Sequence, residues 1–192
     1  MVAQANERKF GETPPELIAA CQRGDYDAFE TLFRAHKDRI YSIALRFAGD
    51  APAAMDITQD TFLKLLAQIQ LFRGEARFET WLFRLVVNAC MDYQRSKRRW
   101  LPLLDGFVHQ VRGRLEPLFS AERAEVRDRV QSAVAKLPAD QRLVVVLRYT
   151  EGLSYEEIAA AMDCAVGTVA SRLNRAHRAL EGQLQEFKGD TA

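Results

Sequence analysis

The chain has 192 residues, of which 48% are apolar and 28% are charged, and its formal net charge is +1. This apolar fraction excludes a globally disordered chain, and the composition also excludes collagen-like and low-complexity classes. With only ten glycines and six prolines, few turns and long elements are expected, which favours an all-α protein. Residues 1–9 lack the apolar stretch of a signal peptide, and the longest apolar run, residues 143–147, is far shorter than a membrane span of roughly 20 residues. We therefore expect a cytoplasmic protein without direct membrane insertion.

The distribution of charge and the cysteines narrow the function further. Residues 1–60 carry seven basic and ten acidic side chains, whereas residues 61–101 carry eight basic and three acidic ones. An acidic N-terminal segment followed by a basic segment indicates different partners for different surfaces.

The three cysteines, Cys21, Cys90 and Cys164, are widely separated. This argues against a disulfide framework or a zinc site and predicts that each packs as a small apolar residue.

Helical patterns follow one another through the first 70 residues. Residues 13–16 have the sequence TPPE, which is typical of a helix start in which the threonine caps the helix and the glutamate completes a capping box. Over residues 29–47, apolar side chains recur at spacings of three and four, which predicts one long amphipathic helix with His36 on its apolar stripe. A turn at residues 49–52 then begins another helix, which is expected to end near Gln70.

Two segments without a sustained period divide the chain. Residues 71–78, LFRGEARF, are predicted to be a loop, after which a helix resumes near Thr80 and ends on a basic cluster. Residues 100–120 are interrupted by prolines and glycines, although they contain several apolar side chains. We therefore expect two small helical domains joined by a linker. The expected bounds are 1–100 for the first domain, 101–121 for the linker and 122–192 for the second domain.

The second domain contains a helix-turn-helix pattern. After helices over about residues 122–136 and 141–149, a second capping box at residues 154–157 and a tight turn at residues 163–165 indicate two further helices. No acidic residue occurs between Asp163 and Glu181. The polar and basic side chains of this stretch include Thr168, Ser171, Arg172, Arg175, His177 and Arg178. A helix in the major groove of DNA needs such a set, because its first residues meet base edges while arginines reach guanines or phosphates.

Three segments, in order, resemble the extracytoplasmic-function sigma factors of bacterial RNA polymerase. Residues 56–66, DITQDTFLKLL, resemble their polymerase-binding helix. Residues 72–99, FRGEARFETWLFRLVVNACMDYQRSKRR, are similar to the segment that opens and reads the minus-10 promoter element. Residues 153–180, LSYEEIAAAMDCAVGTVASRLNRAHRAL, look like the second DNA-binding region. The resemblance covers nearly the whole chain and implies a detachable polymerase subunit that selects promoters and assists their opening.

The resemblance implies contacts at individual residues. For the polymerase clamp helices it implies Asp56, Gln59, Asp60 and Phe62. Phe62 would be an apolar anchor among polar groups, and the alternative is that it belongs to the helix core. For the minus-10 element it implies Phe72, Arg73, Gly74, Arg77, Arg84, Asn88, Lys97, Arg98 and Arg99. A flipped base would lie against the loop, where Gly74 permits a close approach. A packed polar residue is the alternative for Asn88, and Trp81 is expected to belong to the core.

For the minus-35 element, which would be read as duplex, the resemblance implies Thr168, Ser171, Arg172, Arg175 and Arg178. The chain also departs from the family pattern at three positions. Many relatives have a glutamate in place of Met55, a proline in place of Ala165 and an arginine in place of Ala170. The missing arginine removes one DNA contact, so a different promoter motif is expected.

Two other functions fit parts of this pattern. A conventional helix-turn-helix regulator would bind duplex DNA without being a polymerase subunit, but it does not need the loop and basic helix of residues 72–99. A helical adaptor that binds only proteins does not need the acid-free helix. No catalytic, metal-binding or cofactor-binding motif is recognisable, so neither an enzyme nor a small-molecule substrate is expected. The expected partners are core RNA polymerase, promoter DNA and, by resemblance, an anti-sigma factor.

Overall fold

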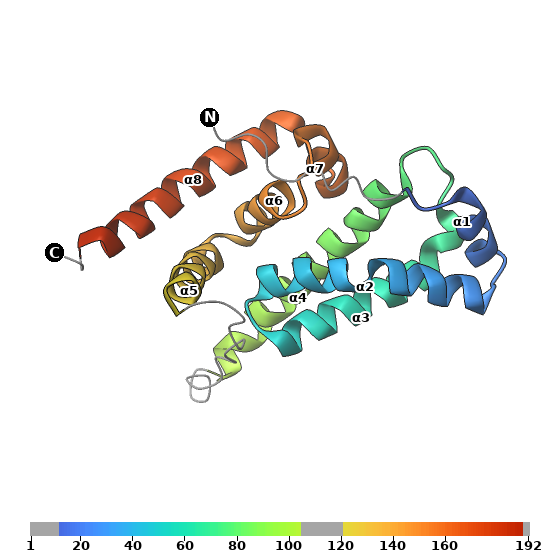
Figure 1. Ribbon diagram of the computed structural model, residues 1–192, viewed down its shortest axis with the longest axis horizontal. Coiled ribbons are helices and arrows are strands. Elements are labelled where there is room, and N and C mark those ends of the chain that lie inside the picture. Colours follow the sequence, from blue (N-terminus) through green and yellow to red (C-terminus); the bar gives the residue numbers. More distant parts are fainter. Residues whose placement is uncertain (1–11, 105–120, 190–192) are drawn as a thin grey trace.

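The structure is a computed structural model that describes residues 12–104 and 121–189 (Figure 1). The regular elements in these two ranges are all helical, which confirms the all-α class. The first range contains α1 (Pro15–Gln22), α2 (Tyr26–Ala48), α3 (Ala51–Gln68), the short 3-10 helix η1 (Ile69–Leu71) and α4 (Phe78–Leu104). The second contains α5 (Ala121–Lys136), α6 (Ala139–Tyr149), α7 (Tyr155–Met162) and α8 (Val166–Gly189). Within these ranges, no helix has the length and apolar character needed to cross a membrane.

The ends of α2 and the start of α3 lie where the sequence predicts them. Asp25 caps α2, because its carboxylate accepts hydrogen bonds from two backbone N–H groups of the first turn. Gly49 ends α2 with a φ of 83°, a left-handed conformation that favours glycine. Asp50 then caps α3 by accepting a hydrogen bond of 2.8 Å from the backbone N–H of Ala53.

The start of α1 differs from the expectation. The predicted capping role of Thr13 is wrong, because Pro14 occupies the N-cap position and makes no side-chain hydrogen bond there. A proline in the first turn has no N–H to satisfy, so this helix needs less capping. Thr13 instead donates hydrogen bonds from its backbone N–H and its hydroxyl to Glu79 Oε1, at 2.8 and 2.9 Å. The threonine therefore ties the N-terminal segment to the start of α4.

Helices α2, α3 and α4 form the core of the first half. The predicted amphipathic helix is α2, and its buried residues include Leu32, His36 and Phe47. Helix α3 packs along α2 and also against α4, burying Ile57 and Leu65. The three helices therefore pack on one another around a shared apolar centre, as the spacing of apolar residues predicts.

Helix α4 is longer than expected and is buried on two sides. It continues to Leu104, into the segment where a break was expected, whereas residues 105–120 of the expected linker lie outside the described ranges. The apolar residues that recur along this helix in the sequence, such as Leu82 and Val86, form the expected stripe, and they belong to the core. Phe83 and Val87 are also buried, and each lies one residue, or about 100°, around the helix from a residue of the expected stripe. This second buried side indicates a second packing partner.

Helices α6, α7 and α8 form the core of the second half, with α7 and α8 arranged as a helix-turn-helix. Ser154 and Glu157 make both bonds of the predicted capping box, at 3.1 and 2.8 Å. Asp163 forms the turn between the two helices with a φ of 49°, a conformation that aspartate adopts more readily than most residues. Val169 and Leu173 of α8 are fully buried, so α8 is fixed by its apolar side.

The two halves pack directly against each other, with α7 against α4 and α6 against α2 (Figure 1). Arg39 of α2 reaches Glu151 between α6 and α7 with an Nε–Oε2 distance of 2.6 Å, and the two side chains are only 11% and 5% exposed. The same guanidinium lies over the ring of Phe83, 4.4 Å from its centroid. Arg142 of α6 donates a 2.7 Å hydrogen bond to the backbone oxygen of Phe47. We call this packing, which the sequence left open, the closed arrangement.

Candidate polymerase-binding and nucleic-acid interfaces

The polar residues expected to contact polymerase lie on the outward side of α3. Asp56 and Gln59 are exposed, and Asp60 is half-buried. Asp60 already has a partner, because Lys64 Nζ lies 2.7 Å from its Oδ2 and 2.7 Å from Oδ2 of Asp92 on α4. Burial alone would lower the pKa of Lys64, but its bonds to the two carboxylates outweigh burial and hold the pKa above its usual value. The bridge fixes α3 to α4 beside the expected docking surface.

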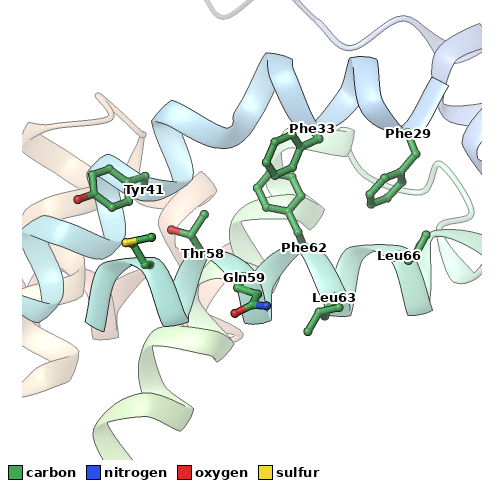
Figure 2. Close-up of a pocket in the computed structure, with 9 residues that line it drawn as sticks. Phe29, Phe33, Tyr41, Thr58, Gln59, Phe62, Leu63 and Leu66 are labelled. Carbon is green, nitrogen blue, oxygen red and sulfur yellow. The ribbon is translucent and has the colours of Figure 1, made fainter. Parts of the chain in front are cut away.

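An apolar groove lies between α2 and α3 (Figure 2). It has a volume of about 410 Å³ and is lined by Phe29, Phe33, Tyr41, Met55, Thr58, Gln59, Phe62, Leu63 and Leu66. Met55, Leu63 and Leu66 are 64%, 59% and 53% exposed. A contiguous apolar patch on the surface of a chain that buries a full core marks an interaction site. We call this feature the α2–α3 groove.

Phe62 lies in the wall of the groove and belongs to the core. Its side chain is only 6% exposed, and its ring points from α3 towards Phe33 of α2, with 4.6 Å between the centroids (Figure 2). The exposed apolar residues beside it are Leu63 and Leu66, which the sequence analysis did not assign to the interface. The sequence contained a signal for these two leucines, because α3 has more large apolar residues than it can bury on one side. The contact of Phe62 with polymerase stays a prediction.

Residues 72–77 form the loop expected to meet the minus-10 element. Its two arginines and Gly74 are exposed, and Gly74 has a φ of 75°, which favours glycine at this position. Phe72 is half-buried in an aromatic cluster with Phe78 and Trp81, whose ring centroids are 5.4 to 5.8 Å apart. Trp81, expected in the core, is half-buried and packs against the core beside Phe72.

The outward side of α4 continues from the loop. Arg84 and Asn88 are exposed one helical turn apart, and Lys97 is exposed further along the helix. The side chains of Arg98 and Arg99 lie outside the described part of the structure. The described residues form a polar strip without a packed partner on its outer side, which leaves their hydrogen-bonding groups accessible to nucleic acid.

A buried polar cluster lies below the start of α4. Thr13 Oγ1 donates to Glu79 Oε1 and lies 3.1 Å from His36 Nε2. Burial lowers the pKa of His36, although the nearby carboxylate of Glu79 opposes this shift. Burial would raise the pKa of Glu79, but hydrogen bonds from Thr13 and from its own backbone N–H outweigh it and hold the pKa below the usual value. The cluster joins the N-terminal segment, α2 and α4.

The side of α8 expected to read DNA is exposed except near Arg172. On this side of α8, Ser171, Arg175 and Arg178 are exposed, and Thr168 is half-buried. Arg172 is half-buried and pairs with Asp140 of α6, with an Nε–Oδ2 distance of 3.1 Å. A DNA contact by Arg172 would therefore compete with an ion pair that already exists.

The cysteines pack as predicted, with free thiols. Cys21 and Cys90 are buried, and Cys164 is half-buried. Burial raises the pKa of Cys90 to about 12, so its thiol is unreactive at neutral pH. Among the described residues, no three His, Cys, Asp or Glu side chains are placed to hold a metal ion.

Comparisons with known proteins show which family the chain resembles. The sigma-70 region 2 family matches residues 32–117, and the sigma-70 region 4 family matches residues 127–180. The RNA polymerase sigma-H factor of Pseudomonas aeruginosa is 36% identical over 183 residues, which cover 91% of this chain and 95% of that protein. The ECF RNA polymerase sigma-E factor of Escherichia coli is 35% identical over 184 residues, which cover 90% and 95% of the two chains.

Two solved structures have the same fold. CnrH in complex with the cytosolic domain of CnrY has a TM-score of 0.65 and 27% identity, covering 89% of this chain and 96% of that chain. The sigma factor RpoE of Bartonella quintana, in complex with the anti-sigma factor NepR, has a TM-score of 0.64 and 27% identity, covering 82% and 96%. Since both sigma-70 families match in order and relatives above 30% identity cover nearly the whole chain, this chain belongs to the extracytoplasmic-function family of RNA polymerase sigma factors.

Proposed function

We propose that this sigma factor binds core RNA polymerase through the α2–α3 groove and the polar side of α3 next to it. The observation that carries the proposal is the groove, whose exposed side chains Met55, Leu63 and Leu66 are large and apolar. Asp56 and Gln59 flank it and are exposed. Apolar anchors in such a patch supply most of the affinity, while the charged rim orients the partner and speeds association.

Promoter reading is assigned to two other surfaces. The loop of residues 72–77 and the strip with Arg84 and Asn88 meet the minus-10 element as a single strand, through exposed arginines, backbone groups and the amide. Helix α8 enters the major groove of the minus-35 element with its exposed polar side, and Arg172 joins after release from Asp140. Polymerase performs the chemistry in the cytoplasm, and the sigma factor is not itself an enzyme.

Reading both elements requires the halves to separate. The elements lie about 25 base pairs apart, which is roughly 85 Å of duplex at 3.4 Å per base pair, whereas α4 and α7 are in direct contact. We infer that the free chain is closed and that residues 1–100 and 122–192 separate as domains on polymerase, joined by residues 101–121. The similar RpoE structure is a complex with an anti-sigma factor, which supports control of this chain by such a partner.

Co-elution with core RNA polymerase, followed by transcription from a promoter library, tests the proposal. We expect a one-to-one complex and transcripts from defined start sites that share a motif. Binding of the free protein to duplex DNA without association with polymerase would instead support a conventional helix-turn-helix regulator.

A further inference from the structure

The loop of residues 72–77 is held at its first end by a side chain from α1. Gln22 Nε2 donates hydrogen bonds to the backbone oxygens of Ile69 and Phe72, at 3.0 and 2.8 Å. Both protons of one amide are thereby used on the chain that leads into the loop. The oxygen of Ile69 also accepts a hydrogen bond from the backbone N–H of Phe72 at 3.1 Å, so the amide of Gln22 adds a bond at this helix end and fixes where the loop leaves η1.

The second end of the loop is held by the segment before α1. Thr13 donates from its backbone N–H and hydroxyl to Glu79 Oε1 in the first turn of α4. Because the single hydroxyl proton goes to Glu79, the 3.1 Å contact with His36 requires Nε2 to donate to Thr13 Oγ1. The hydroxyl therefore accepts one bond and donates one, and the side chains on both sides of it are buried.

The middle of the loop remains open between these two fixed ends. A cavity of about 590 Å³ separates the segment around Thr13 and Ile18 from the loop, and Gly74 and Arg77 line its other side. The aromatic cluster of Phe72 with Phe78 and Trp81 supports the loop from below. Fixed ends with an accessible middle are what a preorganised binding loop requires, since less ordering is left to occur when the ligand arrives.

We propose that Thr13 and Gln22 are positioning residues for reading the minus-10 element. Neither residue needs to touch DNA, because each acts through the end of the loop that it holds. This inference rests on the proposed function of the loop. A loop released from Gln22 would still carry its arginines and bind phosphate, but it would distinguish bases less well, because discrimination depends on geometry more than attraction to phosphate does.

The test uses Gln22→Leu and Thr13→Val in the complete holoenzyme, with Gln70→Leu as the matched control. Gln70 is exposed on η1. Its substitution makes the same change of glutamine to leucine next to the loop but leaves the hydrogen bonds of Gln22 in place. Rates of open-complex formation are measured on a promoter with each single base change in the minus-10 and minus-35 elements. For Gln22→Leu we expect the preference at the most sensitive minus-10 position to fall about tenfold, which is about 1.4 kcal/mol. Thr13→Val should lower the same preference.

In both variants, the base preference at the minus-35 element and the affinity for core polymerase should stay at wild-type values. For Gln70→Leu, the base preferences at both elements and the affinity should all stay at wild-type values. A general loss of folded protein lowers all rates together and leaves the ratios unchanged, so the ratio separates positioning from stability. Wild-type minus-10 ratios in both variants would overturn the positioning role alone. Absence of minus-10 preference in the wild-type holoenzyme would overturn the proposed function of the loop and this inference with it.

Discussion

The α2–α3 groove and the interface between the two halves differ in chemistry. The groove is apolar and open, and Leu63 and Leu66 are more than half exposed. The interface is covered and includes the buried ring of Phe83, yet it also contains the ion pair of Arg39 with Glu151. A buried ion pair adds little net stability, because the cost of removing two charges from water offsets their attraction, whereas covering an apolar surface is favourable. The contrast indicates one surface suited to a lasting partner and another suited to separation.

Replacing Arg39 with methionine should open the closed arrangement, and this is the largest expected effect. The substitution leaves Glu151 without its cation, and removing one partner of a buried ion pair costs about 3–5 kcal/mol. Separation of the halves returns the carboxylate to water and avoids this cost. Small-angle X-ray scattering of the free chain should therefore give a larger radius of gyration than the wild type, with unchanged helix content by circular dichroism.

The double variant Arg39→Met with Glu151→Leu is the control for this prediction. It removes both charges, and replacing a buried pair by apolar side chains is often neutral or stabilising. The double variant should therefore have the wild-type radius or a smaller one. If the single variant also keeps the wild-type radius, the ion pair does not contribute to closure.

A substitution in the α2–α3 groove should change the affinity for polymerase and leave the closed arrangement intact. Leu63→Asp should weaken binding to core polymerase about a hundredfold, because a charge replaces an apolar anchor worth roughly 2 kcal/mol or more. Fluorescence anisotropy with labelled protein measures this affinity, and the radius of the free chain should not change. Phe62→Ala is a poorer test, since removal of a buried ring costs about 3–5 kcal/mol of folding stability.

Leu71→Asp is the matched control for the groove. Leu71 is also an exposed leucine, but it does not line the groove. Its substitution should leave the affinity for polymerase within about twofold of the wild type. Equal weakening by the two substitutions would show that exposed apolar area in general, not the groove, determines binding.

Helix α8 contains one arginine that is paired, Arg172, and two that are exposed, Arg175 and Arg178. The contrast between a covered and an exposed surface can therefore also be tested by DNA binding. Arg172→Ala should reduce discrimination at one minus-35 position about tenfold, since a bidentate arginine contributes about 1–3 kcal/mol. Asp140→Asn releases the guanidinium from its ion pair and should preserve or increase that discrimination. Base-substitution scans in the holoenzyme measure both. Equal losses in the two variants would mean that the ion pair supports the fold and not the contact.

The smallest expected effect is on the pH dependence of stability, and it comes from the buried polar cluster of Thr13, His36 and Glu79. Unlike the ion pair of Arg39 with Glu151, these groups lie within one half of the molecule. The pKa values of His36 and Glu79 both lie below their usual values in the folded chain. The unfolded chain therefore binds more protons, and stability falls as the pH drops from neutral through 6.5 and then below 4.5. Thermal unfolding at pH 5 and pH 3 should show a smaller acid-dependent fall in Tm for Glu79→Gln than for the wild type. An identical fall in the variant would contradict this role.

Local signals predicted most of the helices and the recognition region. The caps at Asp25 and Asp50 and the capping box of Ser154 with Glu157 act over a few residues, so the sequence contains both partners. The end of α4 was predicted less well, because the helix continues to Leu104 through residues whose apolar spacing is irregular. Pro102 disfavours a helix at this point, so continuation of an existing helix prevailed there over the expected break.

The features that escaped prediction depend on partners distant in the chain. The ion pair of Arg39 with Glu151 joins positions separated by 112 residues, and neither residue is unusual in its local pattern. Phe83 and Val87 show that α4 has a second apolar side, but such a stripe does not identify what covers it. Phe62 is a different case, because the sequence left open both a polymerase contact and a place in the core, and its packing against Phe33 shows that its ring lies in the core.

The α2–α3 groove stays uncovered while the halves are closed, and this has a kinetic consequence. If closure hid the groove, only the open fraction of molecules would bind, and the apparent affinity would fall by that fraction. Here each closed molecule presents Leu63 and Leu66 to solvent, so the association rate with polymerase should not depend on how rarely the chain opens. If the groove binds polymerase as proposed, closure delays promoter engagement without slowing recruitment, and the free pool competes for polymerase at its full concentration.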